Sequence, residues 1–226
     1  MMTYTWWGHA CFSVEAGGKK LLFDPFITPN GKASHIDIKT IQADYILVSH
    51  GHGDHIADAV AIAKNTGATI IANYEVAEWL GAKGVKTHPM NTGGKKTFDF
   101  GTVRCVVAQH SSCMPDGAYG GNPMGFLVTT ADGTFYYSGD TALTLDMQLI
   151  PAWGKPDFAI LPIGDNFTMG FEDAAIAAGM VQTKKVFGVH YDTFGFIIIN
   201  HQQATEAFAA KQVQLLLPAI GETIEL

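Results

Sequence analysis

Short apolar or alternating runs, separated by glycine-containing turns, predict strands along the whole chain. Residues 3–7, 10–15 and 19–23 open the sequence as three strands, and Gly17-Gly18 between the last two is typical of a hairpin turn. Further strands are predicted at 45–48, 68–72, 85–88, 98–100, 102–109, 125–130, 134–137, 157–162, 185–189, 214–217 and 223–226.

The segments between these strands predict helices at several points. They span residues 56–65, 74–81, 142–150, 171–181 and 201–211. Both halves of the chain are strand-rich and joined by helices, which favours an α/β (α+β) fold. We expect a four-layer αββα sandwich of two mixed β-sheets flanked by helices. No linker or repeat divides the sequence, so we expect one domain over residues 1–226.

Composition narrows the class of protein. With 226 residues, 47% hydrophobic and 15% charged, the chain is expected to be a compact globular protein rather than a disordered one. A net charge of −7 without a basic stripe disfavours nucleic acid, and no apolar run approaches a membrane span of ~20 residues. Three cysteines without a CxxC pair and the lack of a leader predict a reduced, cytoplasmic setting. The expected partner is a small-molecule substrate, and the chain could also form a homo-oligomer.

The most informative stretch is Ser-His-Gly-His-Gly-Asp-His at 49–55, directly after the apolar strand 45–48. Sheets of α/β proteins place their ligands at such strand ends. Gly51 and Gly53 would let the chain turn tightly, so that side chains two apart converge. Three imidazoles and a carboxylate suit zinc and neighbouring divalent metals. The alternative is a solvated polar turn whose histidines have no common role.

The pattern His-x-His-x-Asp-His resembles the signature of the metallo-β-lactamase superfamily. That resemblance implies three further ligands downstream, a His, an Asp and a His, each at a strand end. The sequence supplies His110 after 103–109, Asp140 after 134–137 and His190 after 185–189. Any one of these alone would more often be structural, but their order and common setting favour a metal site.

The resemblance also implies how the ligands divide between two divalent metal ions. His50, His52 and His110 would hold the first, Asp54, His55 and His190 the second, and Asp140 would bridge them. The histidine-rich set suits zinc, with manganese, iron or nickel as alternatives. The implied function is a metal-dependent hydrolase whose metal-bridging hydroxide cleaves a small ester, lactone or thioester. A phosphodiesterase or phospholipase-like hydrolase, or a non-catalytic metal-binding protein, is the alternative.

Two residues outside the ligand set have candidate roles in the chemistry. Asp54 is expected to accept a proton besides binding metal. His9, in Gly-His-Ala, is a core histidine, a catalytic group on the substrate side, or a residue that supports the metal ligands. Asp24, before Pro25, either initiates a turn or orients a ligand histidine.

Residues 162–170 and 190–194 resemble one branch of the superfamily, the small single-domain metal-dependent hydrolases related to ascorbate-6-phosphate lactonase. Asn166 and Thr193 in these segments are therefore candidates for substrate-side or supporting roles. Asp165 departs from the small residue expected there. The glycine-rich loop 111–124 is either a lid or a connector. The apolar segment 194–199 could line a pocket, form a subunit contact or belong to the core.

Overall fold

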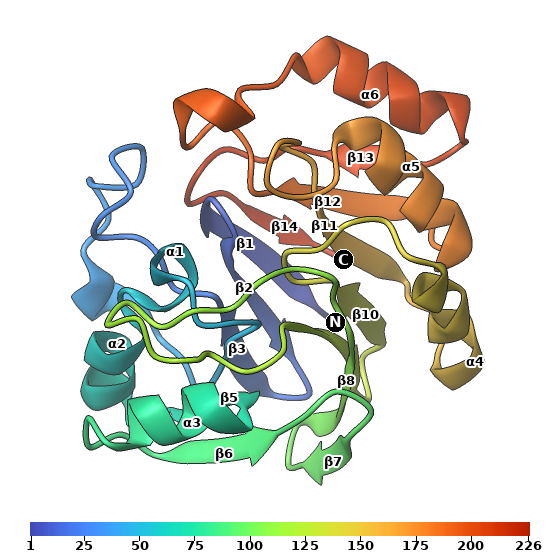
Figure 1. The fold of residues 1–226 in the computed structure, drawn as a ribbon. Coiled ribbons are helices and arrows are strands. Elements are labelled where there is room, and N and C mark those ends of the chain that lie inside the picture. The colour runs from blue at the N-terminus through green and yellow to red at the C-terminus, as the bar shows by residue number, and fades with distance from the viewer.

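A computed structural model describes residues 1–226, which form two seven-stranded sheets packed face to face (Figure 1). In spatial order, the first sheet contains β14 (Thr223–Glu225), β1 (Thr3–Gly8), β2 (Cys11–Ala16), β3 (Lys19–Phe23), β4 (Tyr45–Leu47), β5 (Thr69–Asn73) and β6 (Thr87–Met90). The second contains β13 (Gln214–Leu216), β12 (Lys185–Val189), β11 (Phe158–Pro162), β10 (Thr134–Tyr137), β9 (Met124–Thr129), β8 (Gly101–Val107) and β7 (Lys95–Phe98). Each sheet mixes antiparallel and parallel pairs.

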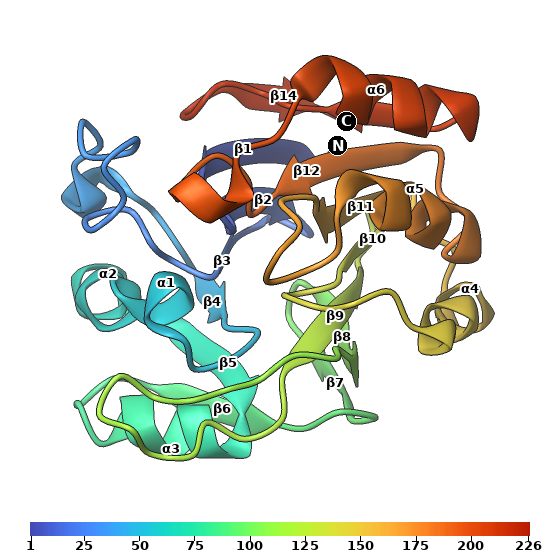
Figure 2. The ribbon, with the colours of Figure 1, turned by 45° about the horizontal axis from the view of Figure 1, so that its top comes forward.

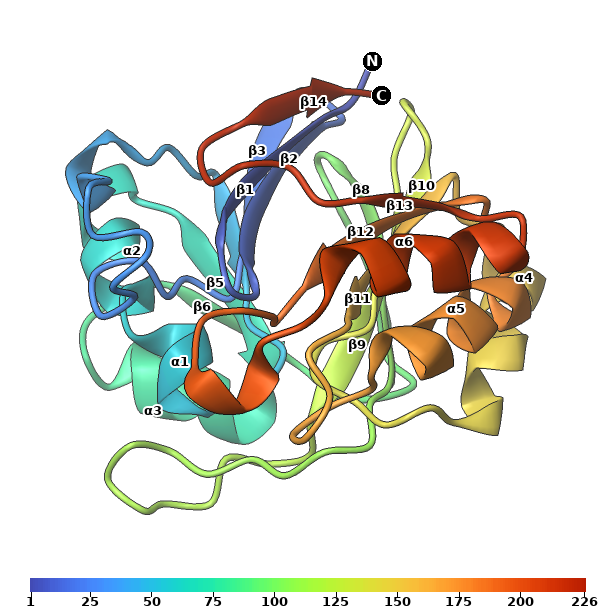
Figure 3. The same cartoon turned by 90° about the horizontal axis from the view of Figure 1, so that it is seen from above.

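Helices cover the outer face of each sheet, which completes the predicted αββα sandwich (Figure 3). The first sheet carries α1 (Gly53–Ile56), α2 (Ala59–Thr66) and α3 (Tyr74–Gly81). The second carries α4 (Ile150–Trp153), α5 (Phe171–Met180) and α6 (His201–Ala210). Short 3-10 turns lie at η1 (Ile38–Thr40), η2 (Leu145–Leu149) and η3 (Gly195–Ile197). No helix is both long enough and apolar enough to cross a membrane.

The main core fills the space between the two sheets. Its centre is aromatic: the rings of Phe12 and Phe23 stack with centroids 4.5 Å apart, and Tyr4 stacks on Phe187 across the sheets. Strand β11 is buried along its whole length, as expected for a parallel strand with a helix on one face and a sheet on the other. A smaller core lies beneath α2 and α3.

Loops that follow the carboxyl ends of strands meet at one edge of the sandwich. Strands β3 to β6 pair in parallel in the first sheet, and β10 to β13 in the second. The two sheets are joined here by a backbone hydrogen bond from His190 N–H to the carbonyl of His9, at 3.1 Å. This edge therefore collects the loops after β1, β4, β10 and β12.

For two of the predicted helices, the structure differs from the prediction in bounds and in helix type. The helix expected over 142–150 is a 3-10 turn, η2, followed by α4, because Pro151 lacks an N–H and fits only the first turn of a helix. The helix expected over 56–65 is two helices that begin earlier, at Gly53. They are separated where the buried Asp58 carboxylate accepts hydrogen bonds from the backbone N–H groups of Ile27 and Thr28.

Candidate metal centre

The 49–55 stretch is partly a loop and partly the short helix α1. His52 is the N-cap of α1, and Asp54 and His55 lie on its single turn. The two glycines differ in their importance. A Cβ at Gly51 would lie 2.4 Å from the sulfur of Met114, whereas a Cβ at Gly53 would meet nothing within 4 Å. Only Gly51 is therefore required by a close approach, and neither glycine adopts the positive φ that would favour glycine in a tight turn.

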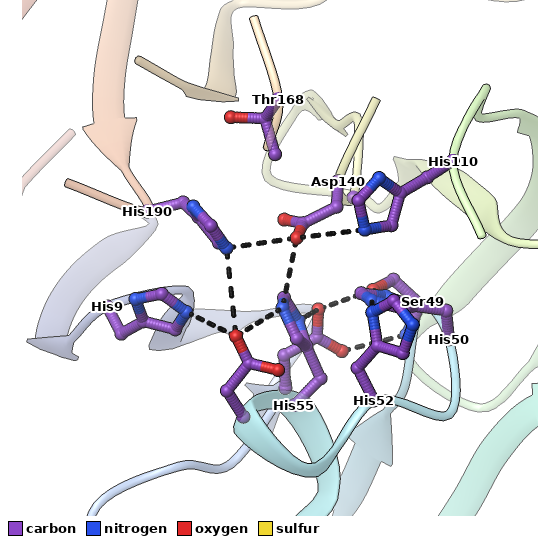
Figure 4. A network of polar contacts seen from close by, with 12 residues as sticks. His9, Ser49, His50, His52, His55, His110, Asp140, Thr168 and His190 are labelled. Carbon is purple, nitrogen blue, oxygen red and sulfur yellow. Dashed lines mark hydrogen bonds and ion pairs between the residues drawn. The ribbon is translucent and has the colours of Figure 1, made fainter. Parts of the chain in front are cut away.

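His50, His52 and His110 form one cluster of imidazoles, with their nearest nitrogens all within 4.8 Å of one another. Nε2 of His50 and Nδ1 of His52 are 2.9 Å apart (Figure 4). His110 reaches them from the loop after β8, three residues beyond the end of that strand. Three imidazole nitrogens that converge in this way match the donor set of a zinc-type site.

A second cluster joins His9, Asp54, His55 and His190, whose ligand atoms also lie within 4.8 Å of one another. Oδ2 of Asp54 is 3.8 Å from Nε2 of His55 and 3.8 Å from Nε2 of His190. His9 is the unexpected member, with its Nε2 only 3.0 Å from the same oxygen. The sequence had left open whether His9 is a core histidine, a substrate-side group or a support for the metal ligands.

Asp140 lies between the two clusters (Figure 4). Its Oδ2 is 3.0 Å from Nε2 of His190, 3.2 Å from Nε2 of His55 and 3.7 Å from Nε2 of His110. One carboxylate oxygen therefore faces histidines of both clusters. This is the geometry that a residue shared by two metal ions would need.

Asp24 supports both clusters from behind. This fully buried carboxylate accepts a hydrogen bond from Nδ1 of His55 at 2.8 Å and one from the Ser49 hydroxyl at 2.6 Å. The same hydroxyl lies 2.9 Å from Nδ1 of His50 and accepts its proton, because its own hydrogen points to Asp24. Each ring is thereby held with Nε2 free to bind a metal. Of the two roles open from the sequence, the geometry favours orientation of a ligand histidine.

The charges of the site favour a cation. Burial by itself would raise the pKa of the Asp140 carboxyl. The larger and opposite effect of His190 and His55 holds this pKa well below its usual value, so the group is ionised. The pKa of Asp54 is likewise lowered by His55, His190 and His9, although burial by itself would raise it. Burial lowers the pKa of His50 well below its usual value and keeps that ring neutral. Two carboxylates and a neutral imidazole are the forms in which these groups bind metal.

Unpaired buried atoms give a direct test of whether a metal fits this site. Nε2 of His55 and Oδ1 of Asp140 are both buried and have no hydrogen-bond partner within the protein. Such atoms are rare in folded proteins and call for an explanation. Because both belong to good metal ligands inside the network, bound cations would account for them, and the residues fit the expected group.

Comparison with known proteins agrees with this geometry. Residues 3–190 match the family model of the beta-lactamase superfamily domain. The chain belongs to the metallo-β-lactamase superfamily. It is 53% identical to a UPF0173 metal-dependent hydrolase of Flavobacterium johnsoniae and 46% identical to one of Methylacidiphilum infernorum, in each case over the full length of both chains. The protein is thus a metal-dependent hydrolase of this superfamily.

Solved structures extend the comparison. Igni18, a metallo hydrolase from Ignicoccus hospitalis, is 30% identical and superimposes with a TM-score of 0.89 over 99% of this chain and 97% of its own. An isothiocyanate hydrolase from Delia radicum gut bacteria is 20% identical, with a TM-score of 0.78 over 99% of this chain and 98% of its own. That second likeness concerns the fold alone.

In this hydrolase, the clusters open into a cavity of about 250 Å³. The residues that line it are His52, Asp54, His110, Ser111, Asp140, Phe167, His190 and Phe194. Ser111 and Phe167 were not named individually from the sequence, although both lie in segments that it singled out, 111–124 and 162–170. Thr168, beside Phe167, lies near His190 and Asp140 in the close view (Figure 4). The only available signal was their position in loops after candidate strands.

Of the supporting residues predicted from the branch resemblance, Thr193 reaches the network and Asn166 does not. The Thr193 hydroxyl is 3.0 Å from Nδ1 of His9. Asn166 is exposed and does not line the cavity, because the left-handed backbone at Asp165 and Asn166 turns the next residue, Phe167, toward it instead.

The loop 111–124 lies against α3, where it is held by several hydrogen bonds (Figure 2). The Asn73 amide donates to the carbonyl of Gly120 at 2.7 Å, and Nε1 of Trp79 donates to Asp116 at 2.7 Å. Met114 is buried in the smaller core. Only Ser111 of this loop lines the cavity. The arrangement favours a fixed connector over a lid.

Proposed function

We propose that this hydrolase uses two divalent metal ions to cleave a small ester, lactone or thioester. The observation that carries the proposal is the position of Asp140, whose Oδ2 faces both His55 and His110 and so points to a shared, binuclear centre. A cavity of about 250 Å³ supports a small molecule as substrate, since it lies just below the ~300–1,000 Å³ usual for ligand sites.

The proposed ligands follow the two clusters. His50, His52 and His110 would hold one ion, Asp54, His55 and His190 the other, and Asp140 would contact both. The all-imidazole set favours zinc for the first position. Metal ions bound there would supply Lewis acidity toward the substrate oxygen and lower the pKa of water toward ~7.

Two of the protein's own side chains, Asp54 and His9, have separate roles in the proposed reaction. Asp54 borders the cavity, and its ionised carboxylate is placed to take up a proton there. His9 contacts Asp54, does not line this cavity and is almost completely buried. Burial, followed by the charge of His190, lowers the pKa of His9 to about 4, so the neutral ring donates Nε2–H to Asp54. We therefore assign His9 a positioning role, which is one of the alternatives that the sequence had left open.

The lining of the cavity favours acyl substrates over phosphodiesters. None of its eight residues is Lys or Arg, so apart from the proposed metal ions no permanently charged side chain would balance a phosphate. A neutral carbonyl compound needs no such partner. The test must therefore distinguish acyl hydrolysis from phosphodiester cleavage, which is the alternative.

The test is an activity screen of the metal-loaded protein against simple lactones, aliphatic esters, thioesters and bis(p-nitrophenyl) phosphate. The proposal predicts turnover of acyl compounds that is lost on chelation and restored by zinc. Faster turnover of the phosphodiester would instead indicate that the protein is a phosphodiesterase. Binding of metal with no turnover of any compound would favour a metal-binding protein.

A further inference from the structure

The cavity above the candidate metal clusters has a polar floor and an aromatic wall. Six of its eight lining residues are polar, and the other two are Phe167 and Phe194. They come from the loops after β11 and β12, which are neighbouring strands. A molecule bound over Asp140 therefore finds its apolar contacts in this cavity at these two rings.

Both rings are unusually open to solvent for phenylalanine. Phe167 is 50% exposed and Phe194 is 37% exposed. Phe196, 76% exposed, meets Phe167 edge to face at 6.1 Å. Three exposed phenylalanines beside one cavity form a patch rather than a scatter, and such patches mark binding surfaces. A ligand that covered these rings would therefore bury apolar surface, which stabilises the complex.

The loops hold the rings in place before any ligand arrives. Phe194 is backed by the ring of Phe26 at 6.2 Å and by the imidazole of His9 at 5.2 Å. Phe167 follows a tight turn in which Asp165 N–H donates to the carbonyl of Met169 at 3.1 Å. One side of the Phe194 ring is thus backed, and the backbone that carries Phe167 is constrained by its turn. A preorganised surface loses little entropy on binding.

We propose that Phe167 and Phe194 are specificity-determining residues that bind an aromatic ring of the substrate. This inference rests on the proposed acyl hydrolase function and narrows its substrate class to aryl esters, aryl lactones or aryl thioesters. A planar ring between two phenyl groups gains stacked or edge-to-face contacts with centroids ~4.5–7 Å apart. The size of the cavity limits the substrate to about one ring beyond the reacting group.

A binding experiment tests the inference without turnover. Benzohydroxamate and acetohydroxamate carry the same metal-chelating group and differ by a phenyl ring against a methyl. Calorimetry on the zinc-loaded protein should give a Kd about tenfold lower for benzohydroxamate. Phe167→Ala and Phe194→Ala should each remove most of that difference and leave the affinity for acetohydroxamate unchanged. Tyr74→Ala, which alters a 55% exposed ring on α3 outside the cavity, is the matched control.

A kinetic experiment separates this inference from the proposed function. Dihydrocoumarin and δ-valerolactone are six-membered lactones with and without a fused aromatic ring. Both phenylalanine variants should raise KM for dihydrocoumarin by a larger factor than KM for δ-valerolactone. Equal effects on the two lactones, together with no phenyl preference in the hydroxamates, would overturn the aromatic surface while the hydrolase stands. A phenyl preference in binding with no lactone or ester turnover would instead retain the aromatic surface and reject the proposed reaction.

Discussion

Asp24 accepts a hydrogen bond from Nδ1 of His55 at 2.8 Å, and this bond points Nε2 of the same ring at Asp140. The carboxylate is completely buried and also holds Ser49, which in turn holds His50. One side chain thereby sets the tautomer of a histidine in each cluster. The loss of Asp24 should weaken both halves of the site at once.

Asp24→Asn is therefore expected to lower zinc affinity by about 10–100-fold. Oδ2 of Asp24 accepts from His55 and from the Ser49 hydroxyl, and Oδ1 accepts from the Ser49 backbone N–H, whereas an amide has only one acceptor oxygen. Competition with a fluorescent chelator measures the change. Asp58→Asn is the control, since Asp58 is also buried and accepts hydrogen bonds from two backbone N–H groups. Equal losses of affinity in the two variants would mean that Asp24 affects zinc binding only by stabilising the fold.

Asp140→Ala should lower kcat/KM on an acyl substrate by about a thousandfold, which corresponds to ~4 kcal/mol. The reason is the removal of the one oxygen that faces both clusters. Circular dichroism should show an intact fold. Asp146→Ala, at an exposed carboxylate in η2, serves as the control and should retain activity. Full activity in Asp140→Ala would contradict the bridging role.

Metal uptake should release protons at neutral pH. In the metal-free site burial lowers the pKa of His190, but the Asp140 carboxylate more than offsets this and raises it to about 9. The pKa of His55 is raised in the same way. Metals bind only the neutral imidazole, so affinity should increase with pH until His190 is deprotonated, near pH 9. Calorimetry in buffers of different ionisation enthalpy measures the protons released, and a buffer-independent heat would refute the expectation.

His9→Ala is expected to lower kcat by about 10–100-fold with little change in KM, because Asp54 loses the group that holds its Oδ2. His9→Gln keeps an N–H donor and should restore part of the rate. Thr193→Val, which removes the hydroxyl 3.0 Å from Nδ1 of His9, should have a smaller effect. A rise in KM without a fall in kcat would instead indicate that His9 contacts the substrate.

Much of this architecture could be predicted because strand ends carry local signals. The apolar strand before Ser49 and the polar residues after it are adjacent in the sequence, and the same pattern recurs at Asp140 and His190. Parallel strands place such ends at one edge of a sheet, so the grouping of the candidate ligands followed from topology. The αββα sandwich was confirmed for the same reason.

The rest depends on contacts between distant segments. Asp24 is held by the Tyr137 hydroxyl, 113 residues away, and nothing near Asp24 in the sequence indicates that bond. The exposure of Phe167 depends on a left-handed turn at two non-glycine residues, a conformation that residue type does not predict. For this reason Asn166 was predicted near the site and its neighbour Phe167 was not named individually.

The binuclear centre is tested most directly by elemental analysis of protein purified without chelator, beside the variants His52→Ala and His190→Ala. These residues belong to different clusters. We predict about two divalent metal ions per chain in the unaltered protein and the loss of about one in each variant. A single ion that disappears in one variant and persists unchanged in the other, or no bound metal at all, would contradict the binuclear centre.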